Sequence, residues 1–132
     1  MKFRTLTGGL LAVIAVGLGA ACGKKSPTTP DAGTTPPVAT TTVTITAAGA
    51  SPRNIQIAPG SRILFINNDS RSHNMTSDPH PEHDECPTIN QVGFLGPGER
   101  RETGNMVDVR VCGFHDHDAA DVIALRGQIV TK

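Results

Sequence analysis

The sequence predicts an all-β sandwich or barrel, because its apolar residues fall in short runs that are separated by turn residues. Pro59-Gly60 and Gly96-Pro97-Gly98 are plain turn signals, and no segment shows a long helical period. We find no internal repeat. We expect strands over residues 43–46, 55–57, 62–66, 91–95, 107–111 and 128–130.

Each expected strand has its own signal. Residues 43–46 are all β-branched, and residues 55–57 alternate apolar with polar. Residues 62–66 form the strongest apolar run, while residues 91–95 end at the second turn signal. Valine alternates with charged residues over 107–111, and residues 128–130 supply a final strand. Residues 69–90 form one long, mostly strandless loop, which in so small a domain is typical of a functional loop.

The N-terminal residues 1–22 predict an export signal. Lys2 and Arg4 precede an apolar run over residues 10–18, which is too short for a confident transmembrane helix. Small residues directly before Cys22 resemble a bacterial lipobox, in which the cysteine is lipidated, although Gly19 stands where leucine is usual. An ordinary cleaved signal is the alternative. We expect a protein that is lipid-anchored on the periplasmic side of a bacterial membrane or at the cell surface.

Residues 23–42 are rich in proline and threonine and predict a disordered tether. Residues 43–132 then form one small domain. This domain holds eight Lys and Arg residues against eleven Asp and Glu, a net charge of −3. Because nucleic-acid binding needs a basic surface, this charge argues against that class of function.

All five histidines lie in two segments of the domain, together with the two remaining cysteines. The first segment holds His73, His80, His83 and Cys86, and the second holds Cys112, His115 and His117. Cys112-x-x-His115, placed just beyond a strand, lets a loop turn a thiolate and an imidazole toward one ion, and His73 can supply a second imidazole. A thiolate with two imidazoles is the donor set of a blue-copper site.

The same residues resemble the cupredoxin family, the plastocyanin and azurin type of Greek-key antiparallel β-sandwich. The resemblance covers residues 43–132 and rests on the segments 57–63, 65–69 with His73-Asn74, Cys112-x-x-His115 and Gly127-x-Ile129-Val130. It implies that His73, Cys112 and His115 hold one copper ion of type 1 and that the protein transfers electrons. The family's axial methionine is missing, since the matching positions are Ala120 or Leu125.

Cys86 leaves the role of Cys112 open. Two cysteines in a small exported domain often form a disulfide, and a Cys86–Cys112 bond would leave no thiolate for blue copper. Copper would then bind to imidazoles alone, drawn from His73, His80, His83, His115 and His117. His115-Asp116-His117 is a plausible pair for such a site.

Two functions therefore stay open, both non-enzymatic and both for a monomer. One is a one-electron carrier with a thiolate site, and the other is a copper-holding or copper-delivery lipoprotein with a histidine-rich site. No Ser-His-Asp ordering or phosphate-binding loop indicates an enzyme. The histidine-bearing loops also carry seven acidic residues, which should favour a redox or copper-exchange partner with a basic docking face.

Overall fold

The computed structural model describes residues 35–132. The predicted signal, the lipidation site Cys22 and the first part of the predicted tether lie outside the described residues. No helix in residues 35–132 is long and apolar enough to cross a membrane. Strand pairing begins at Val38, so the end of the predicted tether already belongs to the folded part of the chain.

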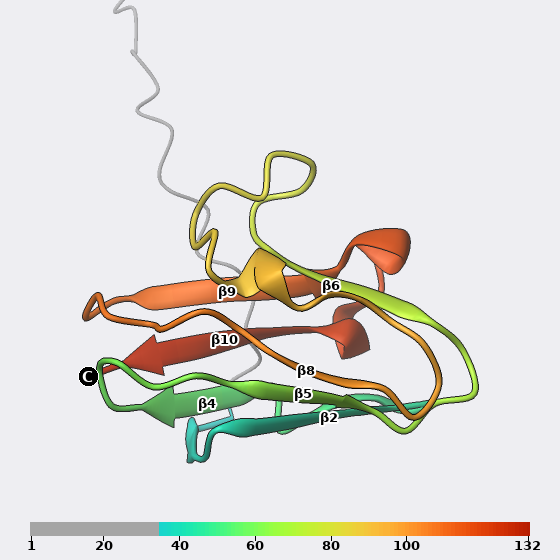
Figure 1. Cartoon of the computed structure of the whole chain (residues 1–132), viewed down its shortest axis with the longest axis horizontal. Helices are drawn as coiled ribbons and strands as arrows, with labels where there is room; N and C mark the ends of the chain where they lie inside the picture. The colour runs from blue at the N-terminus through green and yellow to red at the C-terminus, as the bar shows by residue number, and fades with distance from the viewer. Residues whose placement is uncertain (1–34) are drawn as a thin grey trace, which may run out of the picture.

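Two β-sheets pack face to face, which confirms the predicted all-β sandwich (Figure 1). The strand order is β1-β4-β10-β9-β6-β7 in the six-stranded sheet and β3-β2-β5-β8 in the four-stranded sheet. The strands are β1 Val38–Ala39, β2 Thr42–Thr46, β3 Gly49–Ser51, β4 Asn54–Ile57, β5 Leu64–Asn67, β6 His73–Ser77, β7 Gly93–Leu95, β8 Arg100–Glu102, β9 Val111–Asp116 and β10 Arg126–Thr131, with short 3₁₀ turns at Ile89–Gln91, His117–Ala119 and Ile123–Leu125.

The sheets are mixed rather than purely antiparallel. Strand β4 runs parallel to both β1 and β10, and β2 runs parallel to β5, whereas β9 is antiparallel to β10 and to β6. Phe65 of β5 and Phe114 of β9 meet edge to face between the sheets, with ring centroids 5.3 Å apart. The core therefore lies between the two sheets, and the even-numbered residues of β9 face it.

Residues 107–110 are not a strand, contrary to the prediction. Val107 and Val109 are 61% and 71% exposed, and β9 begins only at Val111. The physical reason is topological: β8 belongs to the four-stranded sheet and β9 to the six-stranded sheet. The chain must cross from one sheet to the other here, so Val107 and Val109 have neither a partner strand nor a core to face.

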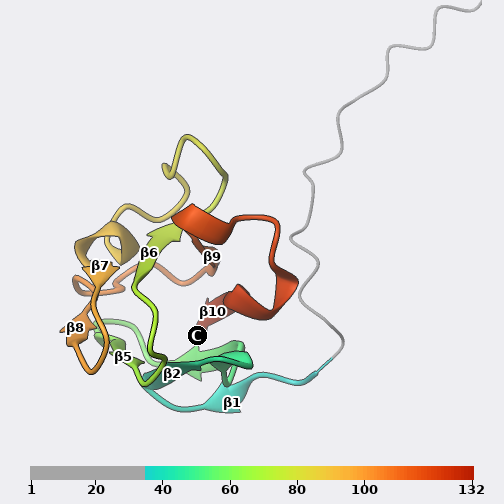
Figure 2. The ribbon, with the colours of Figure 1, turned by 90° about the vertical axis from the view of Figure 1, so that its right-hand side faces the viewer.

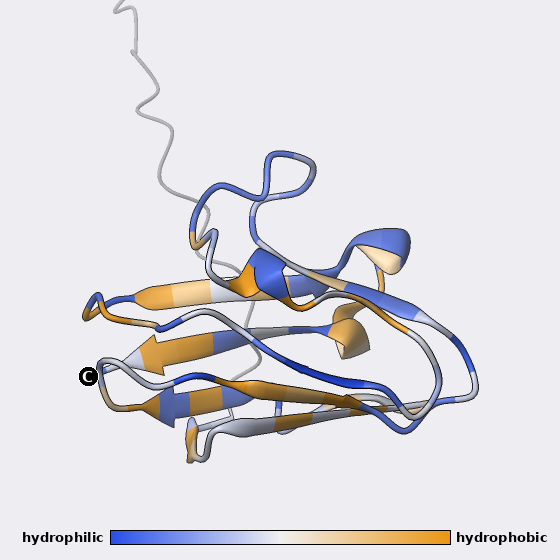
Figure 3. Ribbon diagram, in the orientation of Figure 1, coloured by the Kyte–Doolittle hydropathy of each residue, from blue (hydrophilic) through white to orange (hydrophobic). Residues whose placement is uncertain are grey.

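The predicted long loop over residues 69–90 contains strand β6, which the apolar pattern does not reveal because its sequence is mostly polar. The part of that segment that follows β6 rises above β6 and β9 (Figure 1, yellow) and is mostly hydrophilic (Figure 3). We call residues 78–88 the histidine loop. Seen from the side, this loop and the first turn after β9, His117–Ala119, lie on the same side of the molecule (Figure 2).

Candidate metal centre

Four histidines meet on the outer face of the six-stranded sheet, the face turned away from the core. Their potential ligand atoms all lie within 4.8 Å of one another, and we call the group the four-histidine cluster. His115 is on β9 next to the core-facing Phe114, so its side chain points outward. The members are His80 and His83 from the histidine loop, His115 from β9 and His117 from the turn after it.

Hydrogen bonds orient two of the four rings. The Nδ1–H of His115 donates to the carboxylate of Asp78, and the Nδ1–H of His83 donates to the carbonyl oxygen of Ser77 at 2.9 Å. Both acceptors can only accept, so each neutral ring keeps its lone pair on Nε2. Partners of this kind fix the tautomer and orientation of metal-binding histidines. The rings of His83 and His115 are therefore set to offer Nε2 to an ion.

The spacing suits one ion. The Nε2 of His83 and the Nδ1 of His117 lie 2.9 Å apart, close to the roughly 3 Å between two nitrogens that bind one ion at about 2 Å. Donors to one ion lie at most about 4 Å apart at such bond lengths, so the cluster must close by less than about 1 Å. His80 is exposed, and its ring has no hydrogen bond within residues 35–132, so it can move that far.

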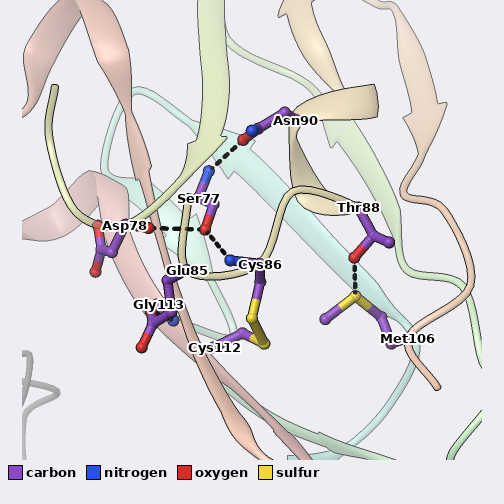
Figure 4. The surroundings of a disulfide bond; sticks show 9 residues. All are labelled: Ser77, Asp78, Glu85, Cys86, Thr88, Asn90, Met106, Cys112 and Gly113. Carbon is purple, nitrogen blue, oxygen red and sulfur yellow. Dashed lines mark hydrogen bonds between the residues drawn. A yellow bond between two sulfur atoms is a disulfide. The ribbon is translucent and has the colours of Figure 1, made fainter. Parts of the chain in front are cut away.

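A disulfide ties the histidine loop to β9. Cys86 in the loop is bonded to Cys112 in β9, and the backbone N–H of Cys86 donates to the Ser77 hydroxyl at 2.8 Å (Figure 4). Gly113 lets the loop approach, because a Cβ at that position would overlap the carboxylate of Asp78. The N–H of Gly113 also donates to Glu85 at 3.0 Å. The loop is thus anchored at both ends of its histidine pair.

Comparisons with known proteins find the fold but no close relative. No protein-family model matches the chain, and no curated protein sequence matches it. Among solved structures, the chain is similar to the "Novel Purple Cupredoxin from Nitrosopumilus maritimus", with 19% identity, a TM-score of 0.55, and coverage of 70% of this chain and 100% of the other. It is also similar to a reduced amicyanin variant, with 12% identity, a TM-score of 0.54, and coverage of 69% and 80%.

A third similar structure is the oxidised plastocyanin from Dryopteris crassirhizoma, with 13% identity, a TM-score of 0.53, and coverage of 69% of this chain and 99% of the other. The chain has the cupredoxin fold. The fold named from the sequence resemblance is thereby confirmed. The donors gathered in this fold are four imidazoles, and no cysteine or methionine is among them.

The three ligands that the cupredoxin resemblance implies are not brought together. Cys112 is in the disulfide, so of the two alternatives for this residue the structure contains the one without a thiolate. Cys112 and His115 also lie within strand β9, not in a loop beyond it, and residues three apart in a strand point to opposite faces. The predicted type 1 donor set of His73, Cys112 and His115 is therefore not formed in this structure.

His73 lies inside the sandwich, away from the four-histidine cluster. It is 2% exposed and sits at the start of β6, where its Nδ1 contacts Asp116 at 2.7 Å and its Nε2 contacts Asp69 at 3.2 Å. Asp116 also accepts from the backbone N–H groups of Asn74 and Asp118. His73 thus joins two buried carboxylates, and one of them caps the turn that carries His117.

Asp69 gives this network a pH dependence. Burial alone would raise the pKa of its carboxyl, but hydrogen bonds from Arg71, His73 and the N–H of Ser70 lower it to about 2. Because this pKa lies below the ordinary value of 3.8, the ionised carboxylate stabilises the folded state above about pH 4. This contribution is lost as the pH falls from about 4 toward 2.

We expect Asp69→Asn to flatten the acid-unfolding profile. The wild-type unfolding midpoint in urea, followed by far-ultraviolet circular dichroism, should fall steeply between about pH 4 and pH 2, and the variant's midpoint should fall less over that window. Glu99→Gln, at an exposed carboxylate, serves as the control and should keep the wild-type slope. Equal slopes in wild type and Asp69→Asn would contradict the assignment.

The sequence did not reveal the residues that orient the cluster. Asp78, Gly113 and Asp116 act through contacts with strands or loops distant in sequence, and no local pattern marks them. Asp78 and Asp116 are among the seven acidic residues of the histidine-bearing loops, but the sequence does not show which of these carboxylates contact a histidine. In the run His115-Asp116-His117 a carboxylate separates two histidines. In the strand, that alternation directs Asp116 to the core and leaves His115 on the outer face.

Proposed function

We propose that this protein binds one copper ion through His80, His83, His115 and His117 and that it holds or delivers copper. The observation that carries the proposal is the four-histidine cluster, in which Asp78 and the Ser77 carbonyl already orient two rings. Imidazole suits copper, zinc, iron and nickel, and copper leads the affinity order of divalent ions. The donors fit copper without any contribution from a thiolate.

The proposal includes an exported, lipid-anchored protein. The disulfide is consistent with a compartment outside the cytoplasm, where such bonds persist. Anchoring through Cys22 and a tether before the domain complete this proposal. Exposed carboxylates near the cluster favour a basic copper-exchange partner; they are Glu82, Asp84, Asp118 and Asp121.

A one-electron carrier is the second candidate, and its support is the likeness to plastocyanin and amicyanin structures. The two candidates differ in colour. A site made only of nitrogens should give a pale Cu(II) protein with a wide EPR hyperfine splitting, whereas a thiolate site gives an intense visible band. A Cu(II) titration of the chain from residue 23 onward, with visible and EPR spectra and a free-thiol assay, separates them.

We expect His115→Ala to weaken Cu(II) binding by more than about 100-fold. Loss of a partner that merely orients a ligand already costs about 10–100-fold, and His115 is itself a proposed ligand. The measurement is competition against a chelator of known affinity. His73→Gln is the control, since His73 is the one histidine of residues 35–132 outside the cluster. The Cu(II) affinity of this variant should stay within about threefold of wild type. Weak binding in His73→Gln with normal binding in His115→Ala would overturn the proposed ligand set.

A further inference from the structure

A cavity of about 480 Å³ opens directly beside the four-histidine cluster. His80 and His115 form part of its wall, so an ion held by the cluster would face into it. The remaining walls come from the histidine loop, from residues 120 and 121 and from the start of β10. This volume is large enough for a small organic molecule, and the proposed copper site leaves the cavity without a function.

Among residues 35–132, Arg126 is the one Lys or Arg in the wall of this cavity. It is paired with His115 across β9 and β10, so both side chains stand on the outer face of the sheet. Within residues 35–132 its guanidinium has no ion pair or hydrogen bond with the protein. An unpaired guanidinium offers a planar set of donors that matches a carboxylate.

Three carboxylates also line the cavity, and two of them already have partners. Asp78 accepts from His115, and Glu85 accepts from the N–H of Gly113, whereas Asp121 is exposed. With neutral histidines the wall carries a net charge of −2, which repels an anion. A bound divalent ion brings that charge to zero, so an anion should enter only when the ion is present.

We propose that this cavity is a binding site for a small anion of the carboxylate class, held jointly by the cluster's ion and by Arg126. The inference rests on the proposed copper site and extends it, because the anion would occupy a position on the ion that the four histidines leave accessible. Such a position lets a carboxylate ligand meet the ion while the protein still holds it. Ligand exchange at the centre would then take place through this cavity.

The test uses azide as a probe and formate as a competing carboxylate. Azide should add a charge-transfer band to the Cu(II)-loaded protein, and the absence of Tyr and Trp keeps the near-ultraviolet background low. Formate should displace azide, and the metal-free protein should bind neither anion by calorimetry. Absence of an azide band, or an azide band that formate leaves unchanged, would overturn the inference.

Arg126→Gln separates this site from ordinary binding of azide to copper. We expect it to weaken azide and formate binding by about tenfold, the usual effect of losing a charged hydrogen bond. Its Cu(II) affinity should stay equal to wild type or rise a few-fold, because a cation near the ion is removed. Arg110→Gln, at an exposed residue just before β9, should leave both affinities unchanged. Equal azide affinity in Arg126→Gln and wild type overturns the inference alone, whereas a chain that binds no copper overturns both it and the proposed function.

Discussion

His73→Ala should lower the free energy of unfolding by about 3–5 kcal/mol, although sequence reasoning names His73 as a copper ligand. The ring is buried and its Nδ1 lies 2.7 Å from Asp116, whose own side chain is 3% exposed. Removing the ring opens a cavity in the core and leaves this buried carboxylate without one of its hydrogen-bond partners, and together these losses cost about that much. Urea unfolding followed by far-ultraviolet circular dichroism measures the change.

His80→Ala is the matched control, because it removes an exposed histidine. Its unfolding free energy without metal should stay within about 0.5 kcal/mol of wild type. The effects on Cu(II) affinity should be reversed. His80→Ala should bind copper more weakly because it loses a proposed ligand, whereas His73→Ala should bind copper normally at temperatures where it is folded. A stable His73→Ala protein that fails to bind copper would make His73 a ligand and not a structural residue.

The two-sheet fold could be predicted from the sequence because short strands and turns are local signals. The apolar run at residues 62–66 and the β-branched run at 43–46 lie in or beside β5 and β2. The sequence does not predict strand β6, because its polar residues are buried by partners elsewhere in the chain and leave no apolar pattern. The parallel pairings were missed for a similar reason, since pairing order depends on contacts distant in sequence.

For the candidate site as well, the sequence shows the local features and not those that depend on contacts distant in sequence. The gathering of histidines in two segments is visible in the sequence, and the structure brings four of the five together. The sequence does not show which face of the sheet each of these residues occupies, because that depends on which residues β9 includes. Cys112 and His115 can converge on one ion only from a loop, and the structure extends β9 through both. Ending the expected strand at residue 111 places Cys112 and His115 in a loop, and the predicted thiolate site depends on that placement as well as on the cupredoxin resemblance.

The disulfide should contribute about 3–4 kcal/mol to stability, so the double variant Cys86→Ala, Cys112→Ala should unfold at clearly lower urea concentration. This estimate is the loop-closure entropy for two cysteines separated by 26 residues. Copper binding should weaken as well, because the bond holds the loop that carries His80 and His83 against β9. A dithiol reductant added to the metal-free wild type should lower the unfolding midpoint in the same way, and an unchanged midpoint would contradict the expected stabilisation.

The single variant Cys86→Ala tests whether a thiolate can take part in copper binding, because it leaves Cys112 in β9 as a free thiol. If the thiolate could join His115 on one copper ion, the Cu(II) protein would become intensely coloured. We expect it to stay pale, because Phe114 and Cys112 share the core face of β9 while His115 stands on the outer face. Rotating a side chain does not move it through the sheet. An intense band that disappears in the double variant would mean that β9 rearranges when the disulfide is absent, and it would restore the electron-carrier candidate.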